Sequence, residues 1–143
     1  MASSLYKTIL VPLDGSGLAE LAAVHAAELS RLASARLVFV RVVASGKGVR
    51  QAADYLFRVN QEAHYEGLKT DGMVKKGDPA EQIVLAAAET GANMIVLSSH
   101  GRTGISRQVF GSVAEAVVRL APCPVMVVKA SPSLPDEERR QTA

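Results

Sequence analysis

The sequence predicts an α/β domain in which five strands alternate with helices and form a mostly parallel sheet covered by helices on both faces. Short apolar, β-branched runs recur along the chain, and segments with apolar residues at helical spacing follow them. Hydrophobic residues make up 48% of the chain and aromatic residues only 4%, which suits helices packed on a parallel sheet through Ala, Val, Leu and Ile. With 143 residues, the chain has the size of one domain with its own core.

The first half of the chain contains two predicted strands and two predicted helices. Residues 5–13 are apolar and β-branched, as in a buried strand, and residues 36–43 alternate as a second strand. Ser16 is the predicted N-cap of the helix between them. Apolar positions at the helical period define the two helices: Leu18, Leu21, Ala22, His25, Leu29 and Leu32 in the first, and Ala52, Leu56, Val59 and Ala63 in the second. We interpret His25 as a core or boundary histidine.

The second half continues the alternation. Residues 72–77 are polar enough for an edge strand. Asp78 as N-cap, Pro79 at the first helical position and Glu81 in a capping box predict a helix, which Gly91 ends. The remaining elements are a strand at residues 93–97, a helix at residues 112–120 and a strand at residues 125–128. We assign residues 1–130 to one domain and residues 131–143 to a polar C-terminal tail.

Charge and composition argue against several function classes. The net charge is only +2, and no clustered basic face indicates nucleic-acid binding. The single cysteine, Cys123, excludes an intrachain disulfide, and we interpret it as a small buried hydrophobic residue. No signal peptide is visible, and the apolar run at residues 83–88 is too short to enter a membrane. We therefore expect a cytoplasmic protein.

Polar and glycine residues follow two strands, at residues 12–16 and 98–112. Ligands of open α/β sheets bind outside the carboxyl ends of the strands, where the winding reverses. A glycine loop that opens a helix can hold phosphate, because glycine permits close approach and the helix N-terminus offers free N–H groups. We therefore predict nucleotide binding, with the backbone of Gly101 and the hydroxyl of Ser112 on the phosphates. Asp14 would face a ribose hydroxyl or a metal bound to the phosphates.

Each of these residues also has a structural interpretation. Asp14 and Gly15 form a common turn dipeptide. Ser112 with Glu115 is also a capping box, in which the hydroxyl only caps the helix. His100 could position its loop or take part in catalysis. Arg102 could pair with a phosphate or lie solvated on a loop. The sequence contains no P-loop, no dinucleotide fingerprint and no cluster of metal ligands, so we assign no catalytic residue.

Five segments together resemble the universal stress protein family. They are residues 9–16 (ILVPLDGS), 77–79 (GDP), 99–104 (SHGRTG), 111–115 (GSVAE) and 121–125 (APCPV). The resemblance covers about residues 4–130 and implies an open sheet of order 3-2-1-4-5, of the adenine nucleotide alpha hydrolase-like type. It also implies homodimers, often paired through the fifth strand.

The ATP-binding members of that family share a pattern of G-x-x-G, nine residues, and then G-[ST]. Gly101, Gly111 and Ser112 match this pattern, whereas Ser98 stands in place of the first glycine and can donate a hydrogen bond. The resemblance implies an adenine and ribose site and a phosphate site. The first would comprise Pro12, Leu13, Asp14 and Val42, and the second Ser98, Gly101, Arg102, Gly111, Ser112, Val113 and Ala114.

Three hypotheses of function remain open. The first is a regulatory module that binds ATP with Mg²⁺ or Mn²⁺, with the metal on Asp14, and signals its nucleotide state to a regulated protein. The second is a slow ATPase. The third is a nucleotide-free dimeric interaction protein, or a binder of another adenine ligand such as a cyclic nucleotide.

Overall fold

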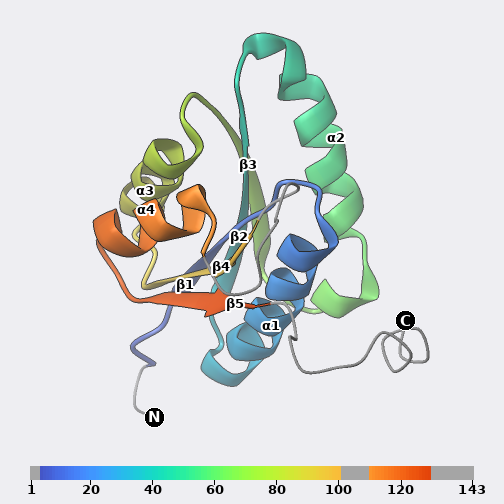
Figure 1. The fold of residues 1–143 in the computed structure, drawn as a ribbon. Coiled ribbons are helices and arrows are strands. Elements are labelled where there is room, and N and C mark those ends of the chain that lie inside the picture. Colours follow the sequence, from blue (N-terminus) through green and yellow to red (C-terminus); the bar gives the residue numbers. More distant parts are fainter. Residues whose placement is uncertain (1–3, 101–109, 130–143) are drawn as a thin grey trace, which may run out of the picture.

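A computed structural model describes residues 4–100 and 110–129 and contains, within these ranges, one five-stranded parallel sheet (Figure 1). The strands are β1 (Thr8–Pro12), β2 (Arg36–Val43), β3 (Thr70–Lys76), β4 (Met94–Ser98) and β5 (Val125–Val128). Their order is β3-β2-β1-β4-β5, and every neighbouring pair is parallel. The predicted fold class is therefore confirmed, including the strand order that the family resemblance implied.

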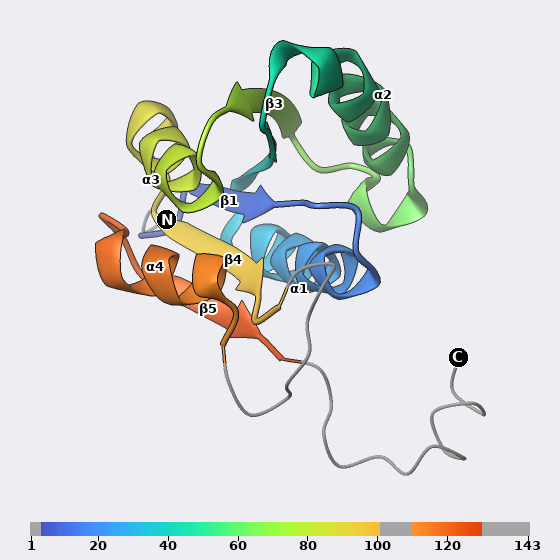
Figure 2. The ribbon, with the colours of Figure 1, turned by 45° about the horizontal axis from the view of Figure 1, so that its top comes forward.

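Helices cover both faces of this sheet (Figure 2). The helices are α1 (Gly17–Ala33), α2 (Val49–Asn60), α3 (Pro79–Thr90) and α4 (Ser112–Leu120), and two short 3₁₀ turns lie at η1 (Gly46–Gly48) and η2 (Ala63–Tyr65). Helices α1 and α2 connect strands added on one side of β1 and lie on one face. Helices α3 and α4 lie on the other face, because the winding has reversed by the time the chain forms β4 and β5.

The core consists of two apolar clusters, one on each face of the sheet. Leu37 and Phe39 of β2 point toward α1 and α2, whereas Val38 and Val40 point toward α3 and α4. All four side chains are at most 2% exposed. Successive strand residues face opposite sides, so a central strand must be apolar throughout. This explains why the predicted strands contain continuous hydrophobic runs.

The buried face of α1 is made of alanines and not of the predicted leucines. Its buried residues are Ala19, Ala22, Ala23, Ala26, Ala27 and Ser30. Leu21 and Leu32 are 45% and 84% exposed. His25 is also exposed, so its interpretation as a core or boundary histidine is wrong. Small side chains allow α1 to lie close against the sheet. The first strand is also shorter than predicted, because its pairing begins at Thr8 and Leu5 is 76% exposed.

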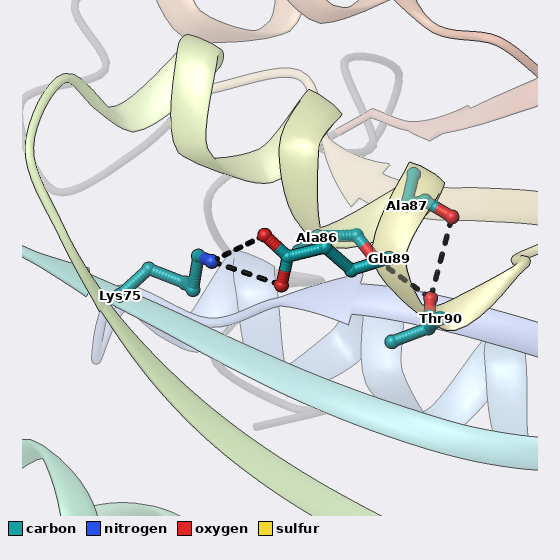
Figure 3. A network of polar contacts seen from close by, with 5 residues as sticks. All are labelled: Lys75, Ala86, Ala87, Glu89 and Thr90. Atoms are coloured by element: carbon teal, nitrogen blue, oxygen red, sulfur yellow. Dashed lines mark hydrogen bonds and ion pairs between the residues drawn. The ribbon is translucent and has the colours of Figure 1, made fainter.

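An ion pair connects the edge strand β3 to helix α3 (Figure 3). Lys75 Nζ lies 2.8 and 3.0 Å from the two carboxylate oxygens of Glu89. One residue further along, the Thr90 hydroxyl donates to the Ala86 carbonyl at 2.7 Å within the last turn of α3. The charge of Lys75 is therefore already paired within the fold.

We predict that Leu10→Ala lowers the free energy of unfolding by about 2–5 kcal/mol. Leu10 of β1 is fully buried in the cluster that faces α3 and α4, so the shorter side chain leaves a cavity between the sheet and these helices. Urea unfolding measures the change. The matched control is Leu32→Ala, which removes the same atoms from an exposed position and should change stability by less than about 0.5 kcal/mol. Equal losses for the two variants would contradict this packing.

Candidate functional site

Strands β1 and β4 stop pairing before their carboxyl ends, at the point where the winding of the sheet reverses, and we call this place the opening between β1 and β4. The two strands pair only at Ile9 with Met94 and at Leu10 with Ile95. Beyond these pairs, β1 continues against β2 as far as Pro12, and β4 continues against β5 as far as Ser98. The loops after β1 and β4 therefore begin on either side of this opening, where open α/β sheets bind ligands.

The loop between β1 and α1 is ordered by its own hydrogen bonds. The Leu13 N–H donates to the Val40 carbonyl at 2.8 Å, and Asp14 Oδ1 accepts from the Ser16 N–H at 2.9 Å. Ser16 in turn caps α1 by accepting from the Ala19 N–H at 3.2 Å. Asp14 is thus a turn former, as one interpretation predicted. Its other carboxylate oxygen makes no hydrogen bond within the described residues.

The predicted adenine and ribose residues divide into exposed and buried positions. Pro12, Asp14 and Val42 are partly exposed, and Val42 packs on the cluster facing α3 and α4. The Leu13 side chain is 1% exposed and belongs to the cluster under α1. Leu13 could therefore contact a ligand only through its main chain.

Arg41 of β2 lies against this loop at Gly15. The sequence did not predict a role for Arg41 in the site. Gly15 has φ +89°, and a Cβ there would lie 3.0 Å from Arg41 Nη1. The guanidinium stacks 4.7 Å from the centroid of the Tyr55 ring, and the Tyr55 hydroxyl donates to Glu20 at 2.8 Å. Burial and this hydrogen bond raise the pKa of Tyr55. Gly15 thus suits both the backbone conformation and the close approach of Arg41.

The end of β4 is tied to the start of α4 through Ser99. The Ser99 N–H donates to the Val128 carbonyl at 2.8 Å, and the Ser99 carbonyl accepts from the Gly111 N–H at 2.7 Å. A Cβ on Gly111 would lie 3.2 Å from that carbonyl oxygen, so glycine permits this contact. The hydroxyl of Ser98, which replaces a family glycine, donates to the His100 carbonyl at 2.8 Å.

The first turn of α4 has free backbone N–H groups. Gly111 is the N-cap and carries no capping side chain, and the first bond of the helix runs from the Glu115 N–H to the Gly111 carbonyl at 3.0 Å. The N–H groups of Ser112, Val113 and Ala114 have no partner in the part of the chain that the structure describes. The capping-box interpretation of Ser112 is wrong, because Ser112 is the first residue of the helix and is exposed.

Two predicted phosphate residues, Gly101 and Arg102, lie outside the described residues. Among residues 4–100 and 110–129, no group of three or more His, Cys, Asp or Glu side chains could hold a metal ion. None of the described helices is both long and apolar enough to span a membrane.

The chain matches the model of the universal stress protein family over residues 5–129. It belongs to the universal stress protein family. It is 33% identical to the universal stress protein MJ0531 of Methanocaldococcus jannaschii, over 88% of this chain and 84% of that protein.

Two solved structures resemble this universal stress protein over most of their length. The structure of MJ0577 from Methanocaldococcus jannaschii has a TM-score of 0.81 at 29% identity. The match covers 90% of this chain and 99% of the MJ0577 chain. The universal stress protein from Archaeoglobus fulgidus in complex with dAMP has a TM-score of 0.72 at 26% identity, with coverages of 87% and 99%.

We predict that stability falls as pH rises from about 10 to about 12. Burial raises the pKa of Tyr65 to about 12 and also raises that of Tyr55, whereas an unfolded tyrosine ionises near pH ~10. Below pH ~10 both tyrosines are protonated in the folded and in the unfolded chain, so their full contribution to the free energy of unfolding is present. Above pH ~10 the two tyrosines ionise first in the unfolded chain, so the free energy of unfolding falls. Urea unfolding across this range measures the effect, and a double Tyr55→Phe, Tyr65→Phe variant should flatten the profile relative to the native chain. Parallel profiles would contradict the prediction.

Proposed function

We propose that this chain binds ATP, or a related adenine nucleotide, in the opening between β1 and β4 and presents its nucleotide state to a regulated protein. Family membership and the dAMP complex of the Archaeoglobus fulgidus relative support an adenine nucleotide as the ligand class. The local geometry supports the position, because the loops after β1 and β4 border the switch point of the sheet.

The observation that carries this proposal is the first turn of α4, whose N–H groups have no cap among the described residues. Three adjacent N–H groups and the positive end of the helix dipole form a site that favours an anion. The exposed hydroxyl of Ser112 adds a fourth donor. By contrast, the first turns of α1 and α3 are capped by Ser16 and Asp78. A phosphate on α4 would take the place that a capping side chain occupies in those helices.

The other end of the nucleotide would lie along β1 and β2. Pro12 and Val42 would contact the adenine, and the free carboxylate oxygen of Asp14 would contact a ribose hydroxyl or the Mg²⁺ or Mn²⁺ carried by the phosphates. Because Ser98 donates its hydroxyl to the His100 carbonyl, it would act by shaping the loop. Gly101 and Arg102 complete the proposed phosphate site by their place in the sequence pattern.

The competing functions are separated by two measurements. Mass spectrometry of the small molecules released from denatured, purified protein identifies ATP, a cyclic nucleotide or no nucleotide. Single-turnover hydrolysis then distinguishes a regulatory module from an ATPase. We expect little or no turnover, because we assign no residue to activate water or to stabilise the transferring phosphoryl group.

We predict that Ser112→Ala weakens ATP binding by roughly 1.5–3 kcal/mol, because a charge-assisted hydrogen bond to phosphate is lost. Titration calorimetry measures both affinities. Ser112→Thr keeps the hydroxyl and serves as the matched control, so it should bind ATP nearly as well as the native chain. An alanine variant with unchanged affinity would show that the hydroxyl does not contact the nucleotide.

We also propose that two copies pair through β5. This strand is at the edge of the sheet, and its residues Val125, Met126 and Val127 remain partly exposed. Val118 and Leu120 of helix α4, which contacts β5, are also exposed, at 46% and 54%. An apolar edge of this kind needs a cover, and a two-fold axis would pair each strand with its copy.

We predict that Val127→Pro weakens this dimer and leaves the domain folded. The carbonyls of Pro124 and Val128 accept hydrogen bonds from β4, so the intervening odd-numbered residues direct their backbone groups to the free edge. Proline at Val127 thus removes a donor only from that edge. Light scattering at micromolar concentration measures the mass, and circular dichroism checks the fold. A monomeric native chain would refute the pairing.

A further inference from the structure

A lysine at the carboxyl end of β5 lies beside the uncapped start of α4. Lys129 directly follows the last residue of β5, and its Nζ lies 5.9 Å from the centroid of the Phe110 ring. Phe110 directly precedes Gly111, the N-cap of α4. A cation is attracted to the face of an aromatic ring, so Phe110 favours this position of the ammonium group.

The backbone fixes the two segments relative to one another. The Val128 carbonyl accepts from Ser99, and the Ser99 carbonyl accepts from Gly111, at 2.8 and 2.7 Å. Two consecutive hydrogen bonds thus connect the residue before Lys129 to the N-cap of α4. Side chains alternate along a strand, and Val127 packs in the cluster facing α3 and α4. Lys129, two residues further, reaches the same side.

Among residues 4–100 and 110–129, the charges around the start of α4 leave a role for this lysine. Glu115 in the first turn of α4 places a negative charge near an incoming phosphate and opposes it. Lys75 is paired with Glu89 (Figure 3). Arg41 stacks on Tyr55 on the opposite face of the sheet, under α1 and α2. The ammonium group of Lys129, in contrast, lies at the ring of Phe110, the residue before the N-cap of α4.

We propose that Lys129 sets the preference of the site for nucleotides with more than one phosphate. This inference rests on the proposed nucleotide binding. One phosphate can be held by the free N–H groups of Ser112, Val113 and Ala114, and the influence of a helix dipole falls off within its first turn. Further phosphates extend the negative charge beyond those N–H groups. The ammonium group of Lys129 is a point charge on a flexible side chain, so it can reach these phosphates.

The test compares ATP and AMP binding by calorimetry in four full-length proteins: the native chain, Lys129→Met, Lys129→Arg and Lys69→Met. The Met variant at Lys129 should bind ATP about fivefold more weakly and AMP less than about twofold more weakly. Its ATP affinity should also depend less on salt. Lys129→Arg keeps the charge and should stay within about twofold of native. Lys69→Met removes the same charge just before β3, at the opposite edge of the sheet, and should match the native chain.

The outcomes separate this inference from the proposed function. Unchanged ATP binding by Lys129→Met, or equal losses for ATP and AMP, would overturn the role of Lys129 and leave nucleotide binding intact. A native chain that binds neither nucleotide would overturn the proposed function and this inference with it. Because Lys129 follows an edge strand, light scattering of each variant establishes that the compared proteins have the same assembly state.

Discussion

The candidate site depends on the point where β1 and β4 stop pairing. Up to Leu10 and Ile95 the two strands are neighbours, and beyond that point each pairs only with the strand on its other side. The two polar loops then leave the sheet on either side of this point.

Both borders of the opening between β1 and β4 are held by contacts between distant parts of the chain. Arg41 packs against Gly15 under the loop after β1, and Ser99 joins β5 to the N-cap of α4 by two main-chain hydrogen bonds. The side chain of Ser99 is 3% exposed, so these bonds are shielded from water. A site whose donors are fixed before the ligand arrives loses less conformational entropy on binding. The fold therefore places the first N–H groups of α4 where the proposed phosphate would bind.

The sequence was sufficient for the features that depend on local chemistry. The α/β class and the caps at Ser16 and Asp78 followed from periodicity and from side chains that bond within a few residues. The buried face of α1 was predicted wrongly. The prediction followed the leucines, which are the most hydrophobic residues of the helix, whereas the side that packs on the sheet consists mostly of alanines. Ser112 was ambiguous, since its spacing to Glu115 fits a capping box if the helix starts one residue later than it does.

The remaining features of the site depend on contacts between distant parts of the chain. Arg41 is a single charged residue within an apolar strand. No pattern in the neighbouring sequence predicted that Gly15 and Tyr55 would lie next to its side chain. Ser99 is buried because β5 and Gly111 both bond to its peptide groups, and those partners lie 29 and 12 residues away in the sequence. Such contacts follow from strand order, which the family resemblance implied but local patterns did not contain.

The most direct measurement is an amide NMR titration of the native chain with ATP and Mg²⁺, compared with adenosine. We expect ATP to shift the amide resonances of Ser112, Val113 and Ala114, because their N–H groups become phosphate donors. Adenosine should leave these three resonances in place while perturbing those near Val42. Binding of ATP that shifts only resonances elsewhere, such as those of the groove between α2 and β3 at Phe57 and Gly72, would contradict it.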